Sequence, residues 1–204
     1  FSSIVFAKGG KTDHSSEDIT NYFFGIISAN QNNTGQAFKH LNKVQTLKNS
    51  HTNYNIQFIR TLVLLNKFSQ AFNFSKEIWS EDEYLFEVDL LLGLESFIKK
   101  DYSAAEKHFE RLNTISSNNL YFRDFFGNIL LAWNSASKNN IEDSFKFFEK
   151  ISDRYNNLKQ IQNIFLQCYF DDPLTQSAFE QLVGGENPGF SRYNYFLANY
   201  LIFK

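Results

Sequence analysis

Small residues recur along this chain at a fixed spacing, and that spacing limits the folds that the chain can adopt. Ala37, Ala71 and Ala105 are equally spaced, and Gly25 and Gly93 are separated by twice the same interval. Large apolar residues fall between them at the spacing of amphipathic helices. A pair of such helices cannot bury its apolar face alone, whereas stacked pairs bury a continuous core. We therefore predict an all-α chain built as an αα-hairpin repeat solenoid.

The clearest copy of the repeat is DLLLGLESFIKKDYSAAEKHFERLNTISSN, residues 89–118. Its pattern predicts two antiparallel helices that turn at Lys100 and Asp101, with Ser103 as the N-cap of the second. The acidic residues 81–83 are predicted to lie in the first turn of the first helix, where they would complement the helix dipole.

Repetition of this unit predicts a repeat domain over residues 16–204, with about five helix pairs and the start of a sixth. Residues 1–15 are predicted to be a signal-peptide tail and a polar leader. The predicted pairs are 16–48, 51–79, 82–116, 121–154 and 157–183, followed by a first helix over 191–204. Ser15 with Asp18, and Asn33 with Gln36, predict the first two helix starts. Asp172 and Pro173 predict a later one.

Close crossing of the two helices in a pair requires a small side chain at the crossing point. The residues predicted to lie there are Gly25, Gly93 and Ala132 on first helices, and Ala37, Ala71, Ala105 and Ser144 on second helices. Ser144 follows Ala105 after an interval that is longer than the others. We attribute the five extra residues to a longer link between the third and fourth pairs.

These residues also carry a resemblance to a known family. Leu92 and Gly93, followed by Ala105 and Phe109, match the L-G…A-x3-F core of the tetratricopeptide repeat, and the interval between the alanines matches its length of about 34 residues. The chain thus resembles a tetratricopeptide repeat protein, and its layout is similar to that of bacterial exported members of the family. The second copy departs from the motif because Ile59 replaces the small residue, and the usual Trp and Pro are missing. A Sel1-like or HEAT-like array is the alternative, although its period fits less well.

The resemblance implies a right-handed superhelix in which first helices line a concave groove. The side chains implied to face this groove are Tyr22, Ile26, Arg60, Leu90, Leu94, Phe97, Ile129 and Trp133. This set is apolar apart from Arg60, which implies that the groove holds a peptide or helix of a protein partner, or other repeats of the same chain. The alternative is that these side chains pack between repeats as core.

No set of residues predicts a reaction, a cofactor or a metal site. His40 and His108 occupy equivalent places in two copies and are predicted to face outward, too far apart to share a metal. Cys168 is the only cysteine, which excludes a disulfide within the chain. The net charge of −2 argues against a nucleic-acid ligand. We predict a non-catalytic protein–protein interaction scaffold. The alternative is a regulatory repeat region of a larger multidomain protein.

The N-terminal residues FSSIVFA are mostly apolar and precede a polar turn, which is typical of the end of a secretory signal peptide. They predict an exported or periplasmic protein, with a cytoplasmic one as the alternative. No segment has the length of apolar sequence that a membrane-spanning helix needs, so no integral membrane segment is predicted. The chain contains no Met and ends within a helical pattern, from which we expect it to be part of a longer protein.

Overall fold

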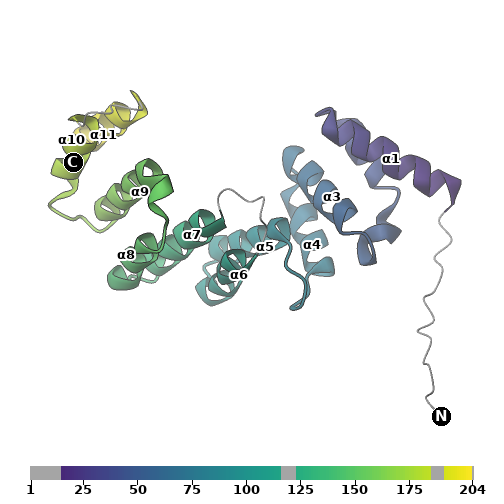
Figure 1. Cartoon of the computed structure of the whole chain (residues 1–204), viewed down its shortest axis with the longest axis horizontal. Coiled ribbons are helices and arrows are strands. Elements are labelled where there is room, and N and C mark those ends of the chain that lie inside the picture. Colours follow the sequence, from purple (N-terminus) through teal and green to yellow (C-terminus); the bar gives the residue numbers. More distant parts are fainter. Residues whose placement is uncertain (1–14, 116–122, 185–190, 204) are drawn as a thin grey trace, which may run out of the picture. The chain divides into compact units, whose positions relative to one another are not determined.

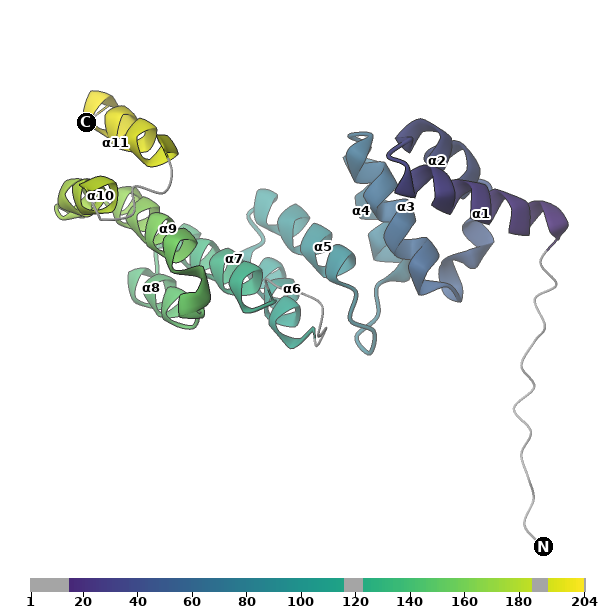
Figure 2. The same cartoon turned by 45° about the horizontal axis from the view of Figure 1, so that its top comes forward.

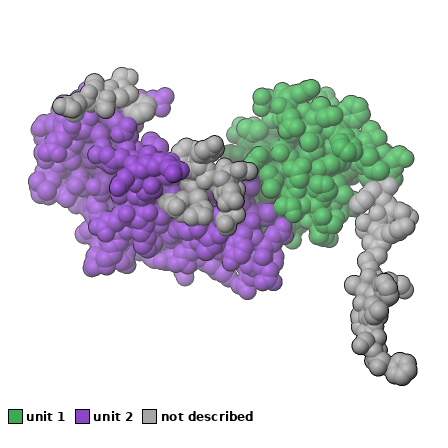
Figure 3. Space-filling view, in the orientation of Figure 1, with its two compact units in different colours: residues 1–78 green, residues 79–204 purple. Residues whose placement is uncertain are grey.

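The computed structural model describes residues 15–115, 123–184 and 191–203 of the chain (Figure 1). These residues form eleven α-helices and two 3-10 helices and contain no strand, which confirms the all-α prediction. The segment predicted to end a signal peptide lies outside them. The chain divides into two compact units, residues 1–78 and residues 79–204 (Figure 3), and each is described by itself.

In both units each α-helix packs against the next along the chain (Figure 2). Unit 1 contains α1 (Ser16–Asn30), α2 (Thr34–Leu41), η1 (Gln45–Asn49), α3 (Thr52–Leu64) and α4 (Phe68–Ile78). Unit 2 contains α5 (Phe86–Ile98), α6 (Tyr102–Thr114), α7 (Arg123–Ser137), α8 (Ile141–Glu149), η2 (Asp153–Tyr155), α9 (Asn156–Tyr169), α10 (Thr175–Gly184) and α11 (Ser191–Phe203). First helices also contact each other, α1 with α3 and α7 with α9, as expected for stacked pairs.

Each of the five helix pairs turns through one non-glycine residue in the left-handed backbone region. These residues are Asn32 (φ 58°), Asn66 (φ 56°), Lys100 (φ 63°), Asn139 (φ 60°) and Asp171 (φ 54°). The first three are spaced at the sequence period, and the fourth follows after the same five-residue extension. In each turn the next N–H donates to the carbonyl five residues earlier, as from Asp101 to Ser96 at 2.9 Å. This is the Schellman arrangement, and its recurrence supports a helical-repeat architecture.

The left-handed turn predicts that glycine is the better residue at position 100. A residue with a Cβ atom pays a steric cost of about 1–2 kcal/mol in the left-handed backbone region, and glycine does not. Part of this gain is lost because glycine gives the unfolded chain more conformational entropy. We expect Lys100→Gly to raise the free energy of unfolding by up to about 1 kcal/mol. Lys100→Ala keeps the Cβ atom and should show no such gain. Urea denaturation followed by circular dichroism measures both, and equal effects of the two substitutions would refute the assignment.

The small residues predicted to lie at helix crossings are all buried. Ala37, Ala71, Ala105, Ala132 and Ser144 are each 0% exposed. A Cβ atom added to Gly25 would lie 2.6 Å from the Leu41 side chain, and one added to Gly93 would overlap the Phe109 ring. These contacts confirm that the helices of the first and third pairs cross at the predicted glycines.

The structure confirms some predicted helix starts and corrects others. Ser15 and Asp18 form a capping box, and the Asn33 side chain accepts a hydrogen bond from the Gln36 N–H. The prediction that Ser103 is the N-cap of α6 is wrong. Because Lys100 turns the chain, Asp101 takes the capping position, and its Oδ1 accepts from the Ala104 N–H at 3.1 Å.

Two other predicted helix starts are also wrong. Residues 81–83 lie in the loop before α5, which begins at Phe86, so they do not form a first helical turn. Pro173 is not the first residue of α10, which begins at Thr175. Asp172 still stabilises this turn, because its Oδ1 accepts a hydrogen bond from the Leu174 N–H at 2.8 Å.

Candidate interaction surface

One position of the first helix is polar and buried in four consecutive pairs. It is occupied by Asn21, Asn55, Asp89 and Asn128. Each lies four residues before the crossing position and therefore follows the same period. Asn21 Oδ1 lies 2.9 Å from His40 Nδ1, and Asn55 donates to the Lys48 carbonyl at 2.9 Å. This position was not predicted from the sequence, although the repeat period was a signal that could have found it.

The third copy of this position carries a charge and collects three donors. The Asp89 side chain is 1% exposed. Its Oδ1 accepts from Arg111 Nε at 2.9 Å and from Trp79 Nε1 at 3.2 Å, and it lies 3.0 Å from His108 Nδ1. The prediction that His108 faces outward is wrong, because its side chain is only 14% exposed. Asp89 is therefore a buried carboxylate whose partners all belong to this unit.

The Arg111 guanidinium connects the loop before α5 to the α5/α6 hairpin by hydrogen bonds. It donates to the carbonyl oxygens of Ser80, Glu81 and Glu83 at 2.7–2.9 Å. It also lies 4.3 Å from the ring centroid of Tyr84. We conclude that the buried charges position this loop.

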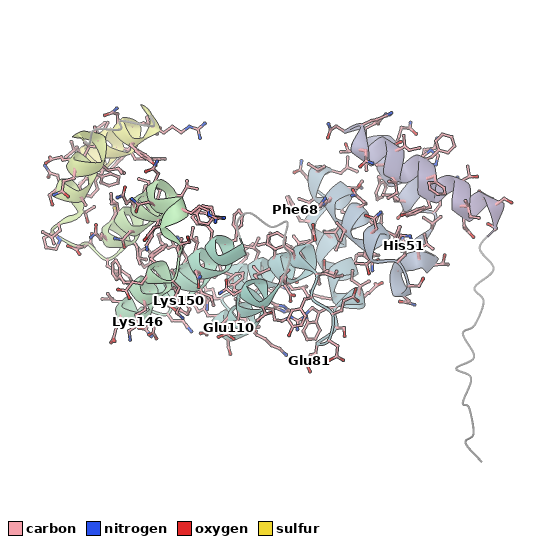
Figure 4. The ribbon with its side chains drawn as sticks, viewed as in Figure 1. His51, Phe68, Glu81, Glu110, Lys146 and Lys150 are labelled. Carbon is pink, nitrogen blue, oxygen red and sulfur yellow. The ribbon has the colours of Figure 1, made fainter. Side chains whose placement is uncertain are left out.

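Glu81, in the same loop, points its side chain toward α6 and pairs with Lys107 at 2.9 Å (Figure 4). The hydrogen bond from Lys107 lowers the pKa of the Glu81 carboxyl. Both partners are exposed, so this pair is a surface contact that adds to the buried cluster beneath it.

The eight residues predicted to line a groove all lie on first helices, and all except the exposed Arg60 are half-buried. Tyr22, Ile26 and Arg60 belong to unit 1 and the other five to unit 2. Leu90, Leu94 and Phe97 pack against the core beneath α6, and Ile129 and Trp133 pack against the core beneath α8. Each of these five side chains therefore contributes to packing as well as to the surface.

Aromatic side chains follow the first helices of unit 2. We define the aromatic row as Phe86 of α5, Phe126 and Trp133 of α7, and Tyr169 of α9. Phe86 contacts Phe126 edge to face at 6.3 Å, and Trp133 contacts Tyr169 in the same way at 5.8 Å. The Trp133 Nε1–H donates to Gln162 Oε1 at 3.0 Å, which fixes the indole against α9.

A separate cavity of about 380 Å³ lies between α9, α10 and α11. Aromatic rings form much of its wall, including Phe165, Phe179 and Tyr200, and the half-buried Cys168 thiol also lines it. Among the described residues, no three His, Cys, Asp or Glu side chains are grouped so as to hold a metal ion. No described helix combines the length and apolarity required to cross a membrane.

Comparison with known proteins gives no identification: no protein-family model matches the sequence, and no curated protein or solved structure is significantly similar to it. The likeness to tetratricopeptide repeats therefore remains a prediction from residue spacing.

Proposed function

We propose that this chain is a non-catalytic helical-repeat scaffold that binds an apolar segment of a protein partner along the aromatic row. The supporting observation is the pair formed by Trp133 and Tyr169. Gln162 holds the Trp133 ring, Trp133 supports Tyr169, and Tyr169 remains 54% exposed. An aromatic side chain held in place before binding loses little conformational entropy in the complex, and Trp and Tyr are the most common binding hot spots.

The low charge of α7 and α9, which carry three of the four residues of the aromatic row, favours an apolar partner. Residues 125–137 of α7 contain no charged side chain, and α9 contains only Lys159. Lys159 is engaged with its own unit, since its Nζ donates to the Ile151 carbonyl at 3.1 Å. A surface of this kind suits the apolar face of an amphipathic helix, with anchors spaced three or four residues apart.

Tyr169→Ala tests the proposal with little disturbance of the core. Peptides selected from a random phage-displayed library against the 204-residue chain should be rich in apolar and aromatic residues. We expect Tyr169→Ala to weaken their binding by about tenfold or more, measured by fluorescence polarisation. Trp133→Ala is less suitable as a test, because Trp133 also packs against core residues.

Phe68→Ala is the matched control for this experiment. Phe68 is an exposed aromatic at the start of α4 in unit 1 (Figure 4), away from the aromatic row along the sequence. Its removal should leave peptide affinity unchanged. Equal losses of affinity in both variants, or selected peptides without apolar anchors, would contradict the proposed function.

A further inference from the structure

Unit 1 contains a small pocket that shares no residue with the aromatic row. Its volume is about 190 Å³, and the residues that line it come from the end of α2, from η1, from α3 and from α4. Its floor consists of Phe58, Leu62 and Phe74, all of them buried. Phe58 and Phe74 pack edge to face, with their ring centroids 4.9 Å apart. The floor of the pocket is therefore apolar and closely packed.

Four carboxamide side chains form most of the rim of this pocket. Asn42 follows α2 and Gln45 lies in η1, whereas Gln70 and Asn73 lie three residues apart on one face of α4. Gln45 Nε2 donates to Asn42 Oδ1 at 2.8 Å. This bond orients both amides and leaves the Asn42 N–H groups as donors and the Gln45 oxygen as an acceptor. All four side chains are exposed, so the rim offers both donors and acceptors to a ligand.

Glu77 alone is charged among the eight residues that line the pocket. Its Oε2 accepts from Lys48 Nζ at 2.8 Å, which joins α4 to η1. Its other carboxylate oxygen can accept a hydroxyl proton. An anionic ligand would lie beside this carboxylate, and a cationic one would compete with Lys48 for it. The pocket therefore suits an uncharged ligand with several hydrogen-bonding groups.

We propose that this pocket binds one ring of an uncharged sugar. Each hydroxyl group both donates and accepts, as the carboxamides of the rim do. A sugar ring carries hydroxyls around its edge, where groups from η1 and from α4 reach them, and its C–H groups fit an apolar floor. Pockets for drug-sized ligands have volumes of about 300–1,000 Å³, so this smaller pocket matches a single ring.

Two other uncharged ligands fit the pocket less well. A nucleobase is usually held by stacking on an aromatic face, but Phe58 and Phe74 are only 3% and 5% exposed. An extended peptide is usually held along a sheet edge or a long groove. Its successive residues point in opposite directions, so a compact pocket reaches few of its polar groups.

Nuclear magnetic resonance titration of the ¹⁵N-labelled 204-residue chain tests this proposal. The probes are the methyl glycosides of glucose, mannose and galactose, titrated through the millimolar range that is usual for ligands of so few atoms. At least one glycoside should shift the side-chain NH₂ signals of Asn42, Gln70 and Asn73 along a single binding curve. Tyr169→Ala, which tests the peptide surface of unit 2, should leave sugar binding unchanged.

A double substitution, Gln70→Ala with Asn73→Ala, removes two carboxamides from the rim. Both side chains are exposed on α4, so the fold should be retained, which circular dichroism checks. We expect the glycoside to bind at least about tenfold more weakly, because two hydrogen-bonding groups are lost. Gln36→Ala is the matched control, because it removes an exposed glutamine of α2 that lies outside the pocket, and it should leave the affinity unchanged.

Four results would overturn the proposal. The first is that none of the three glycosides shifts these signals, and the second is that glycerol shifts them as strongly. The third is an affinity that survives the double substitution or falls equally in Gln36→Ala. The fourth is tighter binding of N-acetylalanine methylamide than of any glycoside, which would make the pocket a site for peptide groups.

Discussion

Arg111→Ala should lower the free energy of unfolding by about 3–5 kcal/mol, the usual cost of removing one partner of a buried ion pair. Asp89 would remain 1% exposed and without its cationic partner. Three carbonyl groups of the loop before α5 would lose their donor at the same time. Chemical denaturation followed by circular dichroism measures the effect.

An exposed ion pair in the same unit provides the control for this substitution. Lys138 and Glu106 lie 2.6 Å apart, with each side chain about one-third exposed. Lys138→Ala should lower stability by no more than about 1 kcal/mol, because solvent screens such pairs. Comparable losses in Lys138→Ala and Arg111→Ala would show that the Asp89 cluster does not hold the loop.

Gly93→Ala should destabilise the chain by about 1–3 kcal/mol because of overpacking. The added Cβ atom would overlap the Phe109 ring at the crossing of α5 and α6, and Phe109 is buried, so its ring has little room to move. The matched control is Gly35→Ala in α2, where no atom lies within 4 Å of the added Cβ atom. That substitution should raise stability by about 0.4–1 kcal/mol. Thermal denaturation measures the stability of both variants, and an unchanged stability of Gly93→Ala would refute the close crossing.

The features that the sequence predicted are those that depend on one residue type at one periodic position. A close helix crossing excludes a large side chain, so the period of Gly93 and Ala105 locates the pairs. The turn at Lys100 was equally visible, because it sits between two apolar patterns of helical spacing. Both are local requirements of a helix pair, and they recur wherever the pair recurs.

The features that the sequence did not reveal depend on contacts between distant residues. His108 and Arg111 lie on a different helix from Asp89, which they contact. Their side chains look like ordinary charges on an exposed helix face until α5 is packed against α6. The prediction that residues 81–83 form a first helical turn is wrong for a related reason. An acidic run before an apolar pattern has the same composition whether it lies in a loop or in the first turn of a helix.

The sequence could predict which helices form the candidate surface, but not how exposed each of its side chains is. Spacing indicated that Leu90 and Trp133 lie on first helices, but it could not say how far each neighbouring pair covers them. In the structure both are half-buried against core residues. Tyr169, the most exposed member of the aromatic row, was not predicted because the fifth pair deviates from the repeat period: its turn at Asp171 comes slightly earlier than the period requires.

The central claim is that one helix-pair unit, closed by one type of turn, is repeated along this chain. Backbone assignment by nuclear magnetic resonance tests it most directly, through Cα and Cβ chemical shifts and coupling constants. We expect helical values interrupted by a single left-handed residue at each of five positions: Asn32, Asn66, Lys100, Asn139 and Asp171. Helical values that continue through these positions, or extended values on either side of them, would contradict it.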